Sequence, residues 1–165
     1  MKFFAHNDGR ELRGSERQLH MLSVELQRRG HDVLISCRES APLDTALRAR
    51  GIATSHIRPR GELDLVSAGR FERVISRFKP DCVLLTSWKR IVNGSFAASY
   101  GRRHSGKTVV RLGIVREFPR GWNGRILRFA FTQYVDDLIV NSNDVAETWR
   151  RTAAWFPGEK LHIIL

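Results

Sequence analysis

The chain has 165 residues, which is the length of one ordinary domain and enough to bury a core. Lysine and arginine number 28 against 17 aspartates and glutamates, and the net charge of +11 favours phosphates, nucleic acid or an anionic membrane surface as partner. The apolar start ends at Ala5, too early for a secretory signal, and no run approaches the ~20 apolar residues of a membrane span. We therefore expect a cytoplasmic protein, with peripheral contact at the inner face of the cytoplasmic membrane as an option.

Strand-like and helix-like stretches alternate along the sequence, an order typical of a parallel sheet with crossover helices. Apolar runs predict strands at residues 2–6, 32–37, 53–57, 81–87, 108–114, 136–142 and 161–165. Periodic stretches predict helices at residues 15–29, 42–50, 66–78, 93–104, 121–134 and 143–154. The predicted fold is a three-layer α/β/α sandwich with a mostly parallel sheet, in one domain over residues 1–165.

The connection between the first strand and the first helix is a candidate phosphate site. Ser15 and Gln18 match the S-x-x-Q pattern of a capping box, which predicts a helix start near Ser15. Gly14 would let backbone amides approach an anion at the positive end of the helix dipole. An ordinary connection with a capped helix explains the same residues.

A P-loop pattern, G-x-x-x-x-G-K-T, occurs at residues 101–108. A P-loop follows a strand and opens a helix, so that amides and helix dipole converge on the phosphates. Here a predicted helix precedes the pattern and a predicted strand follows it. A nucleotide-binding enzyme built on this loop would require a helix to start at Thr108.

Polar and basic residues gather near the predicted carboxyl ends of the strands, where doubly wound sheets bind ligands. They are His6, Asn7, Arg13, Lys89, Arg90, Arg111 and Arg116. Such residues can converge on a phosphate, although a solvated surface charge explains any single arginine or lysine. The six histidines show no metal-ligand spacing, and Cys37 and Cys82 are expected to be buried reduced thiols. No nucleophile motif is present, so the catalytic residues stay unassigned.

The stretch 116–134 interleaves arginines with aromatic residues. A helix carrying Trp122, Arg125, Arg128 and Phe129 could lie in a membrane interface, with the arginines on anionic head groups. In the alternative interpretation, Ile126, Phe129 and their neighbours pack on the sheet and the arginines are solvated.

Taken together, these segments resemble the N-terminal half of a GT-B glycosyltransferase of the retaining family 4 type. The resemblance covers essentially the whole chain and is carried by "RGSERQLHMLSVELQRRGHDVLI", "LDTALRARGI", "RFKPDCVLLTS" and "DDLIVNSNDVAETWRR" followed by "FPGEKLHIIL". It implies a Rossmann-like domain that binds the acceptor, while the nucleotide-sugar pocket belongs to a C-terminal donor-binding domain absent from this chain. By itself this half should be inactive.

The resemblance also implies roles for individual residues. Arg13, Gly14 and Ser15 would face the phosphates of the donor, whereas an acceptor would meet the other polar and basic residues near the strand ends: His6, Asn7, Lys89, Arg90, Arg111 and Arg116. Two departures stand out, because Arg13 replaces the first of the family's two glycines and residues 86–90 lack the histidine found in many members.

The implied reaction moves a hexose from a nucleotide-sugar to a lipid or lipopolysaccharide-type acceptor, without a metal or other cofactor. The competing hypothesis is a non-catalytic basic α/β module that binds nucleic acid or another polyanion. Nucleic acid is not the expected partner, because the aromatic residues cluster in one helix instead of forming a sheet platform.

Overall fold

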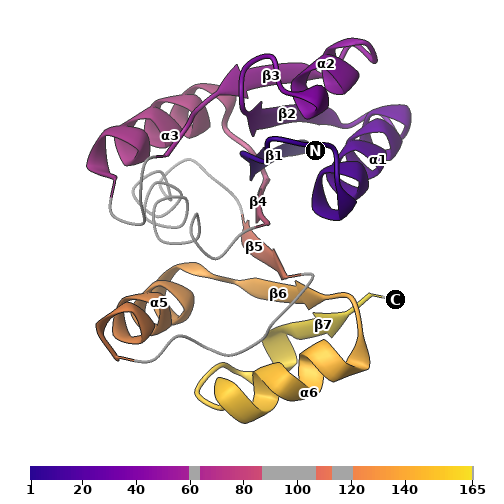
Figure 1. The fold of residues 1–165 in the computed structure, drawn as a ribbon. Coiled ribbons are helices and arrows are strands. Elements are labelled where there is room, and N and C mark those ends of the chain that lie inside the picture. The colour runs from indigo at the N-terminus through magenta and orange to yellow at the C-terminus, as the bar shows by residue number, and fades with distance from the viewer. Residues whose placement is uncertain (60–63, 87–106, 113–120, 165) are drawn as a thin grey trace.

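The computed structural model describes residues 1–59, 64–86, 107–112 and 121–164 (Figure 1). Seven strands form one sheet in the order β3-β2-β1-β4-β5-β6-β7, and every pairing is parallel. They are β1 (Lys2–Asn7), β2 (Asp32–Cys37), β3 (Ala53–His56), β4 (Cys82–Leu85), β5 (Lys107–Leu112), β6 (Asp137–Val140) and β7 (Leu161–Ile163). The described helices are α1 (Gly14–Arg28), α2 (Pro42–Arg48), α3 (Leu65–Phe78), α5 (Gly121–Tyr134), α6 (Asn143–Thr152) and the 3₁₀ helix η2 (Gly158–Lys160). The predicted α/β class and parallel sheet are confirmed.

Two apolar clusters lie on opposite faces of the sheet, because successive side chains of a strand point to opposite sides. Phe4, Val83 and Leu85 belong to the cluster that also holds buried residues of α3, α5 and α6. Their neighbours Ala5 and Leu84 belong to the cluster that holds buried residues of α1 and α2. Figure 1 shows the same division, with α1 and α2 on one side of the sheet and α3 and α5 on the other.

The chain order around β1 creates a switch point. From β1 the chain winds outward through β2 to β3 and then returns to β4 on the other side of β1. In doubly wound folds, ligands bind beyond the carboxyl ends of the strands where the strand order reverses in this way. This geometry makes the β1–α1 connection the natural place to look for a site.

The predicted capping box is wrong. Helix α1 begins at Gly14, with Arg13 as its N-cap, and the carbonyl of Arg13 already accepts from the amide of Arg17 at 2.8 Å. Because Ser15 thus lies inside the first helical turn, two positions after the N-cap, its hydroxyl comes too late in the chain to act as the cap. No side-chain cap is made at this helix start.

Other boundaries differ from the predictions by up to two residues at the ends of elements, as fraying and local caps commonly cause. The predicted helix at 93–104 lies outside the described residues. The P-loop hypothesis is also wrong, because it requires a helix to start at Thr108, and Lys107 and Thr108 begin strand β5 instead. Among the described residues, no helix is long and apolar enough to cross a membrane.

Candidate functional site

The carboxyl end of β1 lies at the switch point and is tied to β4. His6 is opposite Leu85 of β4, and the hydroxyl of Thr86, the residue after β4, donates to the His6 carbonyl at 3.0 Å. The imidazole of His6 is fully buried and meets the ring of Phe71 edge-on at 4.8 Å between centroids. In this structure the His6 side chain thus packs against α3 instead of lining an open rim, and its contact with an acceptor stays a prediction.

The first part of the β1–α1 loop is filled by protein. The Asn7 side chain, which is 7% exposed, accepts a hydrogen bond from the amide of Gly9 at 2.8 Å. The carboxylate of Glu16 reaches back from the first turn of α1 and lies against Gly9, with the residue only 8% exposed. A β-carbon at Gly9 would collide with the Glu16 side chain. Asn7 therefore shapes this loop, which explains its position without an acceptor.

The second part of the loop is open. Arg13, Gly14 and Ser15 are all exposed, and a β-carbon added at Gly14 would meet nothing within 4 Å. Because a helix start leaves its first amides without intrahelical partners and carries a partial positive charge, this surface favours an anion. The side chain of Arg13 pairs with Glu11 at 2.6 Å in an exposed salt bridge. The structure thus brings the three predicted donor-facing residues together on one uncovered helix start.

The remaining predicted acceptor residues are not brought together by the described structure. Arg111 lies in β5, opposite Ile139 of β6. Lys89, Arg90 and Arg116 lie outside the described residues. Their roles stay predictions.

On α5, three of the predicted membrane-surface residues share exposed positions. Arg125 and Arg128 are exposed, as both interpretations expect. Ile126 is partly buried and packs against the core, as the alternative expects, whereas Phe129 is 57% exposed and the alternative is wrong for this residue. The guanidinium of Arg128 lies over the ring of Trp155 at 5.5 Å, and Phe129 meets Tyr134 edge-on at 5.8 Å. Trp122 lies in the first turn of α5, and its side chain is outside the described part. The buried side of the helix carries Ala130 and Phe131.

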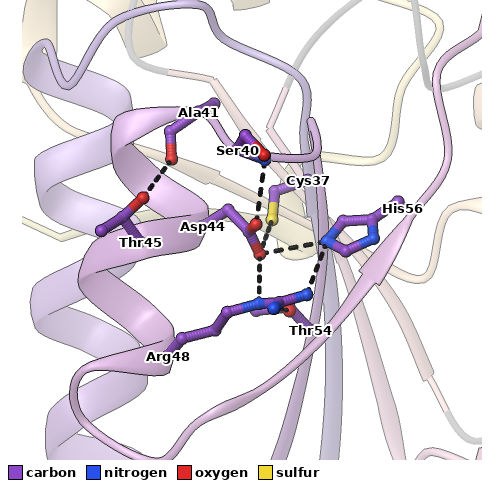
Figure 2. A network of polar contacts seen from close by, with 8 residues as sticks. All are labelled: Cys37, Ser40, Ala41, Asp44, Thr45, Arg48, Thr54 and His56. Carbon is purple, nitrogen blue, oxygen red and sulfur yellow. Dashed lines mark hydrogen bonds and ion pairs between the residues drawn. The ribbon is translucent and has the colours of Figure 1, made fainter.

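A polar cluster that sequence reasoning missed lies where β2, α2 and β3 meet (Figure 2). Atom Oδ1 of Asp44 is 3.7 Å from the Cys37 thiol sulfur and 3.1 Å from Nε2 of His56. The guanidinium of Arg48 donates to the same oxygen at 3.2 Å. Cys37 and Asp44 are 7 positions apart in the sequence, and Asp44 and His56 are 12 apart. This spacing matches no motif, so only the fold reveals the cluster.

The surroundings of this cluster shift two pKa values in opposite directions. Burial, with the Asp44 carboxylate beside the thiol, raises the pKa of Cys37 to about 12. Burial works against ionisation of Asp44 as well, but the hydrogen bonds it receives, led by that from His56, outweigh burial and lower its pKa to about 2. As drawn in Figure 2, the cluster is therefore a carboxylate surrounded by donors, including a neutral thiol.

An apolar cavity of about 310 Å³ lies between α1 and the sheet, with Ile164 near the C-terminal end at its border. Its lining is aliphatic and aromatic apart from Ser23 and Cys82, and the Ser23 hydroxyl donates to the Leu19 carbonyl at 2.7 Å. None of the residues predicted to bind donor or acceptor lines it. Its walls lack the charged groups that would recognise a phosphate, so the exposed start of α1 remains the better candidate.

The sheet is all-parallel, and strand β1 leads into the open start of α1. These are features of Rossmann-like domains, a class in which ligands bind at a switch point. Glycosyltransferase Family 4 matches residues 12–165 of the chain. The chain belongs to this family.

Solved structures share the fold at low sequence identity. HepE of Anabaena, in complex with UDP, superposes with a TM-score of 0.77 and 16% identity over 99% of this chain and 43% of its own. A glycosyltransferase from Rickettsia africae superposes with a TM-score of 0.80 and 15% identity, over 99% of this chain and 42% of its own. The lipopolysaccharide outer core galactosyltransferase WaaB superposes with a TM-score of 0.70 and 11% identity, over 98% of this chain and 44% of its own. The chain thus spans less than half the length of these proteins. No curated protein sequence matches it.

Proposed function

We propose that this chain is the acceptor-binding half of a retaining glycosyltransferase, which moves a hexose from a nucleotide-sugar to a lipid or lipopolysaccharide-type acceptor. Membership of Glycosyltransferase Family 4 supports transfer to an acceptor as the reaction. The likeness to HepE, whose structure contains UDP, and to WaaB, a lipopolysaccharide galactosyltransferase, supports the choice of donor and acceptor class. Transfer requires a second lobe that holds the donor, so the 165-residue chain alone is inactive.

The single observation that carries the proposal is the open start of α1. Cleavage of the bond between sugar and nucleotide builds negative charge on the leaving diphosphate. Amides and a helix dipole that are already aimed at that charge lower the barrier without having to reorganise. The exposed positions of Arg13, Gly14 and Ser15 provide such a surface. This arrangement stabilises the leaving group without a metal ion.

Turnover of nucleotide-sugars tests the proposal. We expect a two-domain enzyme that contains this half to release nucleoside diphosphate from one member of a panel of nucleotide-sugars when lipid or lipopolysaccharide acceptor is supplied. The isolated 165-residue chain should release none. A two-domain enzyme that consumes no member of the panel, while it binds duplex or single-stranded DNA in a salt-sensitive way, would instead support the polyanion-binding hypothesis.

The exposed face of α5 supports a second part of the proposal, peripheral contact with an anionic membrane. Arg125 and Arg128 are one helical turn apart and flank the exposed ring of Phe129. Basic side chains attract anionic head groups, and an exposed aromatic ring can enter the interface between them. This pairing of charge and ring suits a lipid-linked acceptor better than a soluble one.

Sedimentation with vesicles tests this part. The double variant Arg125→Glu/Arg128→Glu should lose binding to vesicles that contain phosphatidylglycerol. The matched control is Arg70→Glu/Arg73→Glu, which makes the same charge change at the same spacing on an exposed part of α3. We expect the control to bind more weakly than the unaltered protein but much more strongly than the α5 variant. Equal losses would show that only total charge matters, and no loss would remove α5 from the membrane surface.

A further inference from the structure

The cluster of Cys37, Asp44 and His56 contains three kinds of metal-ligating atom. The thiol sulfur, a carboxylate oxygen and an imidazole nitrogen all lie within 4.8 Å of one another. They come from three different elements, since Cys37 ends β2, Asp44 lies in the first turn of α2 and His56 ends β3 (Figure 2). The sheet register pairs Cys37 with His56, so the backbone fixes the separation of two of the three.

Two of the three distances between the ligand atoms approach those of a tetrahedral zinc site. Zinc binds sulfur at about 2.3 Å and nitrogen or oxygen at about 2.0 Å, so neighbouring ligand atoms in a tetrahedral site lie roughly 3.3 to 3.6 Å apart. Here Oδ1 of Asp44 lies 3.1 Å from Nε2 of His56 and 3.7 Å from the sulfur of Cys37. Shifts of a few tenths of an ångström would bring these two pairs to the required spacing.

A hydrogen bond to its second oxygen also fixes the orientation of the Asp44 carboxylate. Its second oxygen, Oδ2, accepts a hydrogen bond from the backbone amide of Ser40 at 3.0 Å, which turns Oδ1 toward Cys37 and His56. Outer hydrogen bonds of this kind orient metal ligands in proteins. The side chain of His56 is 27% exposed, whereas that of Asp44 is 5% exposed, so an ion can enter from the side of the imidazole.

We propose that Cys37, Asp44 and His56 bind a Zn²⁺ ion through Sγ, Oδ1 and Nε2, with water as the fourth ligand. On binding, the thiol gives its proton to solvent, and Nε2 of His56 loses the proton that faces Asp44, so that the neutral ring carries its one proton on Nδ1 and coordinates through Nε2. The guanidinium of Arg48 moves away into water. Its side chain is 59% exposed, so this displacement requires no change in the core. The charge of the ion takes the place of the thiol proton and of the arginine as the partner of the carboxylate.

The bound ion would join α2 to the ends of β2 and β3. It lies on the connections that follow those two strands, whereas the proposed donor surface is on the connection that follows β1. The inference concerns the stability of this part of the fold and does not depend on the proposed transfer reaction. It also leaves unchanged the proposal that transfer itself needs no metal.

The alternative is a purely hydrogen-bonded cluster, in which Arg48 is the permanent partner of Asp44. Arg48 contacts both sides of the candidate site, since it donates to Oδ1 of Asp44 at 3.2 Å and lies 3.4 Å from Nε2 of His56. The two possibilities predict opposite behaviour when this side chain is shortened. If a metal binds, removing the competing cation must strengthen binding, because like charges repel.

Cobalt serves as a spectroscopic probe for zinc sites, because thiolate coordination gives a charge-transfer band and tetrahedral geometry gives intense visible bands. We expect both bands when the metal-free protein is titrated with Co²⁺, and we expect Zn²⁺ to abolish them by displacement. Cys37→Ser should lose the charge-transfer band, and Cys82→Ser, which alters the other cysteine of the chain, should retain it. Zn²⁺ should also raise the melting temperature of the unaltered protein, and the rise should grow with the logarithm of the free Zn²⁺ concentration above Kd.

Arg48→Ala provides the decisive variant, because it keeps all three ligands. We expect it to bind Co²⁺ at least severalfold more tightly than the unaltered protein, and His56→Ala to bind it at least tenfold more weakly. Absence of the charge-transfer band from both the unaltered protein and Arg48→Ala would overturn the proposal. A band that survives Cys37→Ser but disappears in Cys82→Ser would also overturn it.

Discussion

The first and last α-helices of the domain begin in different ways, although each follows a parallel strand of the same sheet. At α6 the Ser142 hydroxyl accepts from the amide of Val145 at 3.2 Å, so a side chain of the protein satisfies the helix start. At α1 the N-cap is Arg13, which makes no side-chain cap, and the residues around it are exposed. The start of α6 is therefore closed by a side chain of the protein, whereas the start of α1 carries no side-chain cap.

The side chains near the two helix starts show the same difference between a closed and an open connection. Helix α6 buries Trp149, which is 1% exposed and whose ring lies 5.0 Å from Phe131 and 5.8 Å from Phe156. Helix α1 instead turns Glu16 back under the loop and leaves open space beside Gly14. One connection is thus built for stability and the other for access, which is why family function is best sought at the first.

The largest loss of stability should come from a substitution in α6, the helix whose start is capped. Trp149→Ala removes a buried indole from the aromatic cluster, and such changes cost about 3–5 kcal/mol because a cavity remains. Urea denaturation followed by circular dichroism would measure the loss. The exposed neighbour Arg150 gives the control, since Arg150→Ala should change the unfolding free energy by less than about 0.5 kcal/mol. A loss below about 1 kcal/mol for Trp149→Ala would mean that the cluster does not stabilise the α6 end.

Gly9 lies in the filled part of the β1–α1 connection, and Gly14 lies in its open part at the start of α1. Gly9→Ala places a β-carbon against the end of the buried Glu16 side chain, which must swing away, and the lost packing should cost about 1 kcal/mol of unfolding free energy. Gly14→Ala meets nothing within 4 Å and should be nearly neutral in the same denaturation experiment. If the two substitutions cost the same, the loop is not divided in the way the structure shows.

A difference of similar size concerns the caps themselves. Ser142→Ala removes a side-chain cap and should cost about 1 kcal/mol. Ser15→Ala removes a hydroxyl that caps nothing, so we expect almost no change in thermal or urea stability. An equal cost at both serines would restore the capping box that the sequence pattern predicts, and the start of α1 would then be closed.

Much of the fold could be predicted from the sequence because burial imposes a period on each element. The run from Asp32 to Cys37 and the helix from Gly121 to Tyr134 have the predicted bounds. The start of the first helix near Ser15 was also predicted to within one residue, but the cap was not. A serine and a glutamine three positions apart can lie inside a first turn without capping it, and the hydrogen bond between the Arg17 amide and the Arg13 carbonyl shows that the helix begins before Ser15.

The site was less predictable, because side-chain direction depends on tertiary contacts. His6 ends a strand as expected, yet its imidazole packs on Phe71 from a helix 65 positions further along the chain. The meeting of Cys37, Asp44 and His56 follows from the pairing of β2 with β3 and from the position of α2, none of which a spacing rule contains. Gly14 has open space beside it, which the predicted anion site requires, but its role toward the donor phosphates stays a prediction.

The most direct test of the central claim is the turnover number of Gly14→Trp in a two-domain enzyme that contains this half. The indole would cover the amides at the start of α1, and loss of one such donor group in other enzymes costs about 10²–10³ in rate. We predict a fall in kcat of at least about tenfold for Gly14→Trp, with unfolding free energy unchanged, and near-normal kcat for Gly14→Ala. An unchanged kcat in the folded Trp variant would show that the departing diphosphate is not stabilised there.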